Sequence, residues 1–409
     1  MSLPQEVVDF IIDQLEGSPA SLKSCSLVSK RWTARSQKYI FARVVIRSDY
    51  LRRWCRRITP GSTGVSPYAT HLVLVAVANT LMEEPWFEPT LLKHASDHLT
   101  SFTNVHTLDV VRWKFSDEEG YTTPFTQVAQ TTRTLRVTSP VLDASTILPF
   151  VTFFHRAESI SITHPQVTAE EFVVPDPLPM PSTKLCWTSM RLLDLSDKSL
   201  PLLSWIAQLP LKLISLSVGL QSQSYHSDPL AGLLRASSET LQTLQLCRST
   251  GGELSDFEAP VTSSLLNITD PLSAAFTPLP LLLPPLPQLR SIRFCALLGV
   301  GWLRAETLLS ITSQHISRVT IEMQYLLDPV ILGSIIDWDA IDRALQVLEI
   351  RSQSHRSSKM VLQFYCLTHE WKEELRRLKE GTGWLPRFER AGVIEFVSDE
   401  DIGRWNSRV

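Results

Sequence analysis

Residues 2–15 read SLPQEVVDFIIDQL, and residues 21–32 read SLKSCSLVSKRW. In the first segment apolar residues recur three and four positions apart, which is the spacing of one face of an α-helix. Pro4 suits the first turn of this helix, because its φ is fixed and it has no backbone N–H to leave unpaired. Gly17, Ser18 and Pro19 end the helix. The pattern then predicts two more short helices, at 20–28 and 30–40.

Three such helices do not readily fold alone. Isolated helices shorter than about 12–15 residues are marginal in water, and chains below about 40 residues seldom bury enough surface. Each apolar side chain contributes roughly 1.5–3 kcal/mol when it is buried. The apolar positions are too widely distributed for so short a segment to cover them all. We therefore expect either the rest of the chain or a partner protein to cover this surface.

The apolar and polar positions of this segment resemble those of an F-box, a three-helix module. The residues that carry the resemblance are Leu3-Pro4, Glu6, Ile11-Ile12, Leu15, Leu22, Cys25, Leu27-Val28-Ser29-Lys30 and Trp32. The segment departs from the family at Gly17-Ser18-Pro19, where an acidic connection is usual. The resemblance implies docking on the Skp-type adaptor of a cullin–RING (SCF-type) ubiquitin ligase. The alternative is an ordinary helical bundle that packs on its own downstream domain.

The resemblance also implies which residues contact the adaptor. They are Leu3, Pro4, Val8, Ile11, Ile12, Leu15, Leu22, Leu27 and Val28. Periodicity alone does not separate the residues that face the adaptor from those that hold the three helices together. We assign Trp32 and Tyr39 to the core of the module.

The composition is that of a soluble globular protein. The chain has 409 residues, of which 44% are hydrophobic and 20% are charged, and this length suggests two or three domains. No apolar run reaches the roughly 18 residues of a membrane helix, and the N-terminus lacks the pattern of a signal peptide. The six cysteines lie far apart without a C-x-x-C motif. We expect reduced thiols, and hence a cytoplasmic or nuclear protein that does not bind membranes.

Residues 1–60 carry eleven Lys and Arg against five Asp and Glu. We expect the F-box to span 1–45 and a linker to span 46–68. In this linker Ser48-Asp49 caps a helix with arginines on its outer face, and the glycines and proline of 60–64 form a hinge. A solvated linker is favoured over a patch that binds phosphates or acids. Neither an aromatic platform nor zinc-ligand spacing indicates nucleic-acid binding.

Beyond the hinge an L-x-x-L-x-L pattern recurs, the strand half of a leucine-rich repeat. Its clearest copies begin at Val105, Ala157, Met190, Leu211, Leu241, Leu289, Ile316 and Leu345, and weaker ones are Leu72-Leu74, Leu135-Val137 and Ile394-Phe396. Return helices are expected at 201–208 and 228–236. The Asn of the repeat is missing, since Trp113, Lys198, Ser249 and Gln324 occupy its positions. The prediction is an α/β fold: the F-box followed at 69–409 by an irregular leucine-rich-repeat-like solenoid with a parallel sheet. The alternative is an α/β domain without true repeats.

Two proline-rich segments, near 173–183 and 258–288, exclude helix and central strand and predict extended insertions. A P-x-x-P ligand is possible in the second, but Leu281-Leu282-Leu283 favours packing on the solenoid. The C-terminal cap is predicted as strands at 360–366 and 392–397, with a helix from Thr368 to Gly381 between them.

No common catalytic motif is present, so we expect a non-enzymatic protein without a cofactor. His94 and His98 have metal-ligand spacing but no third ligand nearby in the sequence, and no metal is expected. The hypothesis is a ligase substrate receptor whose strands bind a client protein through Asp109, Arg136, Asp194, Gln245, Arg293, Glu322, Glu349 and Arg351. The alternative is a non-ligase interaction scaffold whose F-box packs on its own repeat domain.

Overall fold

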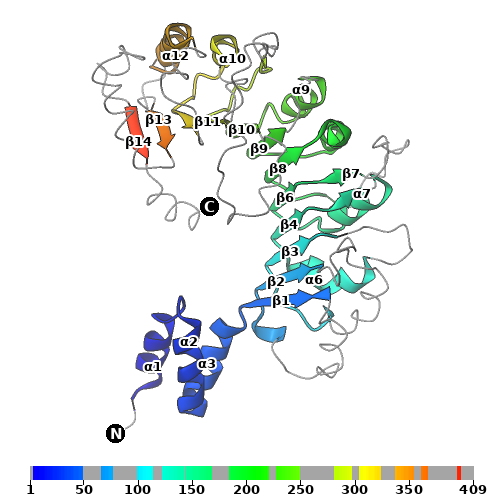
Figure 1. The fold of residues 1–409 in the computed structure, drawn as a ribbon, viewed down its shortest axis with the longest axis vertical. Coiled ribbons are helices and arrows are strands. Elements are labelled where there is room, and N and C mark those ends of the chain that lie inside the picture. The colour runs from blue at the N-terminus through cyan, green and yellow to red at the C-terminus, as the bar shows by residue number, and fades with distance from the viewer. Residues whose placement is uncertain are drawn as a thin grey trace, which may run out of the picture. The chain divides into compact units, whose positions relative to one another are not determined.

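The computed structural model has a mixed α/β fold with parallel strands and helices (Figure 1). It describes residues 3–48, 66–76, 99–113, 122–142, 144–167, 184–220, 227–248, 281–296, 304–323, 337–353, 361–366 and 394–397. The chain divides into two compact units, Met1–Arg191 and Leu192–Val409. Among the described helices none is long and apolar enough to cross a membrane.

The first unit begins with three helices, α1 (Gln5–Asp13), α2 (Pro19–Val28) and α3 (Lys30–Ile40). All three helices predicted from the sequence are confirmed. Pro4 precedes the first turn of α1 and Pro19 begins α2, where a missing N–H leaves no hydrogen bond unmade. Both α1 and α2 pack against α3.

The strands of the first unit follow one another in the sheet in the order of the sequence. They are β1 (Arg43–Arg47), β2 (His71–Val75), β3 (Thr107–Val111), β4 (Thr134–Thr138) and β6 (Ser159–Thr163), and the neighbouring pairs are parallel. The short strands β5 (Val141–Leu142) and β7 (Gln166–Val167) form a separate parallel pair. The connections contain η1 (Ser66–Tyr68), η2 (Thr123–Phe125), α6 (Thr126–Thr131) and α7 (Ala144–Phe153). In Figure 1, α6 and α7 lie on the same side of these strands.

The sheet begins earlier than expected. The sequence places a linker at 46–68 and the first strand after residue 69, whereas β1 follows α3 almost directly and pairs with β2. The predicted linker helix after Ser48 lies outside the described residues.

Strand alternation and a repeated backbone geometry define the sheet. In β3 the side chains of Leu108 and Val110 are fully buried, while the residues between them face the other side. The carbonyl of His106, just before β3, accepts the N–H groups of Arg133 (2.8 Å) and Thr134 (2.9 Å) at the start of β4. The same arrangement precedes each neighbouring strand, with acceptor carbonyls on Ala42, Thr70, Arg133 and Glu158. The strands are thus aligned at a fixed register.

The residue that follows each of three strands adopts a left-handed conformation. These residues are Arg112, Ser139 and His164, with φ of 56°, 48° and 50°. The N–H of Arg112 donates to the carbonyl of Thr138, and that of Ser139 donates to Thr163, both at 2.8 Å. The hydrogen-bond ladder thus continues one step beyond β3 and β4, although a positive φ is unfavourable for a residue with a Cβ atom.

An aromatic cluster fills the core beyond β3. Phe125 lies edge-on to Trp113, Phe150 and Phe154, with ring centroids 5.9, 5.5 and 6.2 Å away, and all four side chains are buried. Trp113 occupies a position at which the predicted repeat would have Asn, and its ring packs in this aromatic cluster. Lys198 is exposed, and Ser249 and Gln324 lie outside the described residues.

The second unit repeats this plan. Strand β8 (Ser189–Leu195) crosses the boundary between the units, and η3 (Asp197–Ser199) follows it. Strands β9 (Ser215–Leu220), β10 (Thr243–Arg248), β11 (Ser291–Ala296), β12 (Arg318–Met323), β13 (Val361–Cys366) and β14 (Ile394–Val397) lie in this order, and neighbours are parallel. The helices are α8 (Pro201–Gln208), α9 (Ser227–Ala236), α10 (Ala305–Leu309) and α12 (Trp338–Gln353). Helix α8 packs against α9, and α10 packs against α12.

Most of the predicted elements of this unit are confirmed, including both return helices and the strands at 360–366 and 392–397. The strand predicted from Leu345-Leu348-Ile350 is wrong, because these residues belong to α12. The L-x-x-L spacing of three also fits one face of a helix. Ile341 and Ala344 extend this face and are buried with Leu345 and Leu348.

The proline-rich segments are described only in part. Residues 173–183 lie outside the described residues, as does the predicted helix from Thr368 to Gly381. In the second segment Leu281 and Leu283 are buried, and the N–H of Leu283 donates to the hydroxyl of Ser310 at 2.9 Å. The burial of Leu281 and Leu283 agrees with the predicted packing of this segment, whereas Leu282 is exposed, and packing on a repeat solenoid as such stays a prediction.

Candidate interaction surfaces

Helix α1 has two apolar stripes, and only one of them lies in the core of the helical region. Val8 and Ile12 are buried with Leu22 of α2, and Leu15, Trp32, Tyr39 and Ile40 pack around these three. Val7 and Phe10, three residues apart on α1, form a second stripe, and Leu3 lies just before the helix. These three side chains are exposed, by 41%, 64% and 51% respectively. The helices thus complete a core of their own and still leave an apolar stripe uncovered.

The end of α2 carries a second exposed apolar site. Leu27 is 86% exposed and Val28 is 64% exposed. The Thr33 hydroxyl lies 2.8 Å from the carbonyl oxygen of Ser26 and 2.9 Å from that of Ser29 and donates toward both, which fixes the turn into α3. Because this turn is held by side-chain hydrogen bonds, Leu27 and Val28 occupy a defined position. A partner that binds Leu27 and Val28 therefore does not have to order a loop, which would weaken the binding.

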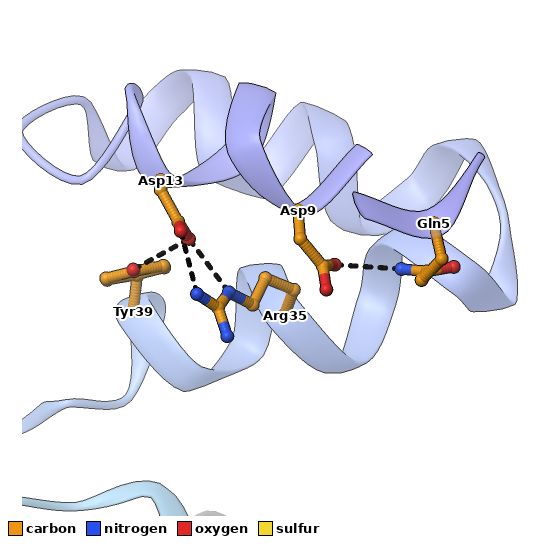
Figure 2. A network of polar contacts seen from close by, with 5 residues as sticks. All are labelled: Gln5, Asp9, Asp13, Arg35 and Tyr39. Atoms are coloured by element: carbon orange, nitrogen blue, oxygen red, sulfur yellow. Dashed lines mark hydrogen bonds and ion pairs between the residues drawn. The ribbon is translucent and has the colours of Figure 1, made fainter. Parts of the chain in front are cut away.

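A polar network joins α1 to α3, as Figure 2 shows. The Arg35 guanidinium donates to both carboxylate oxygens of Asp13, at 2.8 and 2.7 Å, and the Tyr39 hydroxyl donates to Oδ1 at 2.8 Å. On the same side of α1, the Gln5 amide donates to Asp9 at 2.8 Å. These contacts occupy the polar side of α1 and fix its orientation on α3.

Hydrogen bonding within this network shifts the pKa values of all three titratable groups, Asp13, Arg35 and Tyr39. The hydrogen bonds from Arg35 and then from Tyr39 lower the pKa of Asp13 from its ordinary 3.8 to about 2. The hydrogen bond to Asp13 raises the pKa of Arg35, and it also raises the pKa of Tyr39. The network is therefore an ion pair at neutral pH.

The structure divides the nine predicted adaptor contacts. Val8, Ile12 and Leu22 are buried among the helices, so they hold the module together and offer no surface to a partner. Their assignment as contacts is corrected. Ile11 and Leu15 are half-buried, and four residues are exposed: Leu3, Pro4, Leu27 and Val28. Trp32 and Tyr39 pack against the core, as expected.

Two exposed residues of the α1 stripe, Val7 and Phe10, were missed in the sequence analysis. Their spacing of three residues was the available signal. The sequence pattern predicts a single apolar face on α1, whereas the structure has a second apolar stripe beside the first.

Two of the predicted client residues come together in the first unit. Asp109 on β3 and Arg136 on β4 are register partners, and Arg136 Nη1 lies 4.0 Å from Asp109 Oδ1. His71 Nε2 on β2 lies 2.7 Å from Asp109 Oδ2. Asp109 is therefore largely engaged by its own neighbours, whereas Arg136 remains more than half exposed.

In the second unit Gln245 and Arg293 are register partners on β10 and β11. Glu322 lies on β12 opposite Cys295. Asp194 has a φ of 57° in β8. Glu349 and Arg351 do not lie on a strand, so their assignment to a strand face is wrong; both belong to α12. Arg351 donates to the carbonyl oxygens of Leu309 and Ile311, at 3.3 and 2.9 Å.

Within the described ranges no three His, Cys, Asp or Glu side chains form a group that could hold a metal ion. His94 and His98 lie outside these ranges. A scan against models of known protein families finds no match to this chain, and a search of curated proteins finds none either.

Proposed function

We propose that this chain is a substrate receptor of a cullin–RING ubiquitin ligase. In this proposal α1–α3 act as an F-box-like module that docks on a Skp-type adaptor. The strands that follow act as an irregular leucine-rich-repeat-like solenoid that binds a client protein. Such a receptor acts in the cytoplasm or the nucleus and needs no catalytic residue or cofactor. It raises the effective concentration of the client beside the transferring enzyme.

The exposed apolar side chains of the helical region carry this proposal. Phe10, Leu27 and Val28 remain exposed although the helices already have a closed core of Val8, Ile12 and Leu22. Full burial of such a side chain contributes roughly 1.5–3 kcal/mol. Exposed apolar side chains held on rigid helices are suited to anchor a protein–protein contact.

The sheet supports the second half of the proposal. Consecutive strands are neighbours, and the same carbonyl geometry precedes strand after strand within each unit, for example at His106 in the first and Gln242 in the second. This arrangement is typical of repeat proteins, in which each repeat packs against the next one. One sheet face then presents outward side chains from many strands to a single partner.

Co-purification with a Skp-type adaptor tests the proposal. The full-length chain is expected to retain the adaptor, and Phe10→Glu combined with Leu27→Glu is expected to lose it, because two charges enter an apolar interface. Ile350→Glu is the matched control, since Ile350 is 69% exposed on α12. A melting temperature equal to that of wild type verifies that each variant is folded. Retention of the adaptor by the double variant, or no retention by wild type, refutes the proposal.

A further inference from the structure

The outward face of the first-unit strands carries exposed arginines at intervals. Arg136 lies between the buried Leu135 and Val137 of β4, and Arg191 lies between the buried Met190 and Leu192 of β8. Both side chains therefore point away from the core. Arg43 is exposed on the same face of β1, in the alternation set by the buried Ile46.

The register places these arginines at defined separations. The N–H of Ser189 donates to Glu158 O at 3.0 Å, just as that of Ser159 donates to Arg133 O at 3.0 Å, so β8 continues the alignment of β6. Arg191 thus lies two strands from Arg136. Because neighbouring strands are about 4.8 Å apart, the two backbones are about 10 Å apart. Arg43 on β1 lies three strands from Arg136 in the other direction, or about 14 Å.

One acidic side chain lies beside these arginines. Among the described strand residues of this unit, Asp109 is the single acidic side chain on the outward face. Its side chain is 15% exposed, and its carboxylate lies 2.7 Å from His71 Nε2 and 4.0 Å from Arg136 Nη1, while the Arg136 side chain stays 55% exposed. The positions between the arginines are mostly Ser and Thr, including Thr134, Ser161 and Thr163. The face therefore combines positive charge with hydroxyl hydrogen-bonding groups.

We propose that this face binds a carboxylate-rich segment of a protein, with Arg136 and Arg191 as its main contacts. Binding of a single phosphate favours several arginines converging on one dianion, whereas these arginines are spread over separate strands. In a segment with polyproline-II geometry, which has three residues per turn and rises about 3.1 Å per residue, acidic side chains three positions apart point the same way and are about 9 Å apart, which is close to the separation of Arg136 and Arg191. This inference rests on the proposed function, because it specifies the chemistry of the client.

Fluorescence anisotropy with the full-length chain tests the proposal. The probe is a fluorescein-labelled peptide of repeated Glu-Gly-Ser, and the reference peptide has Gln in place of each Glu. We expect saturable binding of the Glu peptide that weakens steeply with salt, because the contacts are exposed ion pairs. Arg136→Glu combined with Arg191→Glu is expected to weaken binding at least tenfold, and Arg136→Lys with Arg191→Lys is expected to retain most of it.

Two controls separate this proposal from others. Arg235→Glu makes the same type of change at an exposed residue of α9 and is expected to leave binding unchanged. Phe10→Glu combined with Leu27→Glu tests adaptor docking and is also expected to leave peptide binding unchanged, so a failure of one proposal is distinguishable from a failure of the other. Equal binding of the Gln peptide, no effect of the charge reversal, or tighter binding of the Gln peptide with one phosphoserine as its sole charged side chain overturns the inference.

Discussion

Asp13 shows how a single side chain determines what the N-terminal helices can present. Its carboxylate accepts hydrogen bonds from Arg35 and Tyr39 of α3, and this directs the polar side of α1 toward α3. The apolar stripe of Val7 and Phe10 is left on another side of the helix. The same carboxylate that stabilises the packing of the helices therefore also exposes the proposed contact residues.

The lowered pKa of Asp13 gives a pH-dependent prediction. A carboxyl group whose pKa falls from 3.8 to about 2 on folding contributes stability that is complete above about pH 4 and is lost as the pH falls through about 2. Asp13→Asn is therefore expected to lower the melting temperature near pH 7. The difference between wild type and variant should shrink between about pH 4 and 2. Thermal melts across this range measure it.

Gln14→Asn is a control for this prediction, because Gln14 is exposed next to Asp13 and carries no charge. It should leave the pH profile of wild type unchanged. Equal melting temperatures of Asp13→Asn and wild type at pH 7 would show that the network does not stabilise the helices.

At the scale of helices and strands, a predicted element agrees with the structure where the sequence fits either the helical or the strand periodicity but not both. Helices α8 and α9 were predicted almost to the residue, because proline or an acidic residue begins each one and buried leucines recur at helical spacing. The L-x-x-L-x-L pattern at residues 345–350 fits both a strand and a helix. The sequence predicts a strand there, whereas the helical pattern that precedes these residues continues through them in α12. Strand β1 was missed because five residues directly after a helix give too short a pattern.

The candidate sites were predictable only in part for the same reason. Periodicity identifies apolar positions on α1, but it does not tell whether Val7 or Val8 faces the core. That choice depends on packing against α2 and α3, which a local pattern does not contain. Likewise, alternation in β3 and β4 placed Asp109 and Arg136 on one face correctly, whereas the contact of Asp109 with His71 depends on strand order.

The aromatic cluster around Phe125 yields a prediction at this scale. Phe125 contacts rings from the end of β3 and from α7, so Phe125→Ala is expected to destabilise the first unit by about 3–5 kcal/mol through a buried cavity. Phe125→Leu should cost less, because it retains more of the apolar volume. Gln130→Ala, at an exposed position of α6, should change stability little. Urea denaturation measures all three, and a loss below about 1 kcal/mol for Phe125→Ala would contradict the packing described.

At the scale of the whole molecule, the helices and the strands can be tested for independence. The scaffold alternative requires the helices to pack on the strands that follow them, and α3 does contact η1. The exposure of Leu27 and Phe10 favours independence. Removal of residues 1–40, which retains β1 as the edge of the sheet, is therefore expected to leave a monomeric chain with a cooperative thermal transition. Aggregation, or a transition lower by more than about 10 °C, would support the scaffold alternative.

The proposed completion of the apolar surface by a second molecule is tested most directly by isothermal titration of a purified Skp-type adaptor into the full-length chain at several temperatures. We predict saturable binding with a negative heat-capacity change, because Phe10, Leu27 and Val28 leave water on binding. Phe10→Glu combined with Leu27→Glu should remove the binding heat. Absence of binding by wild type at every temperature, or equal binding by the double variant, would contradict this proposal.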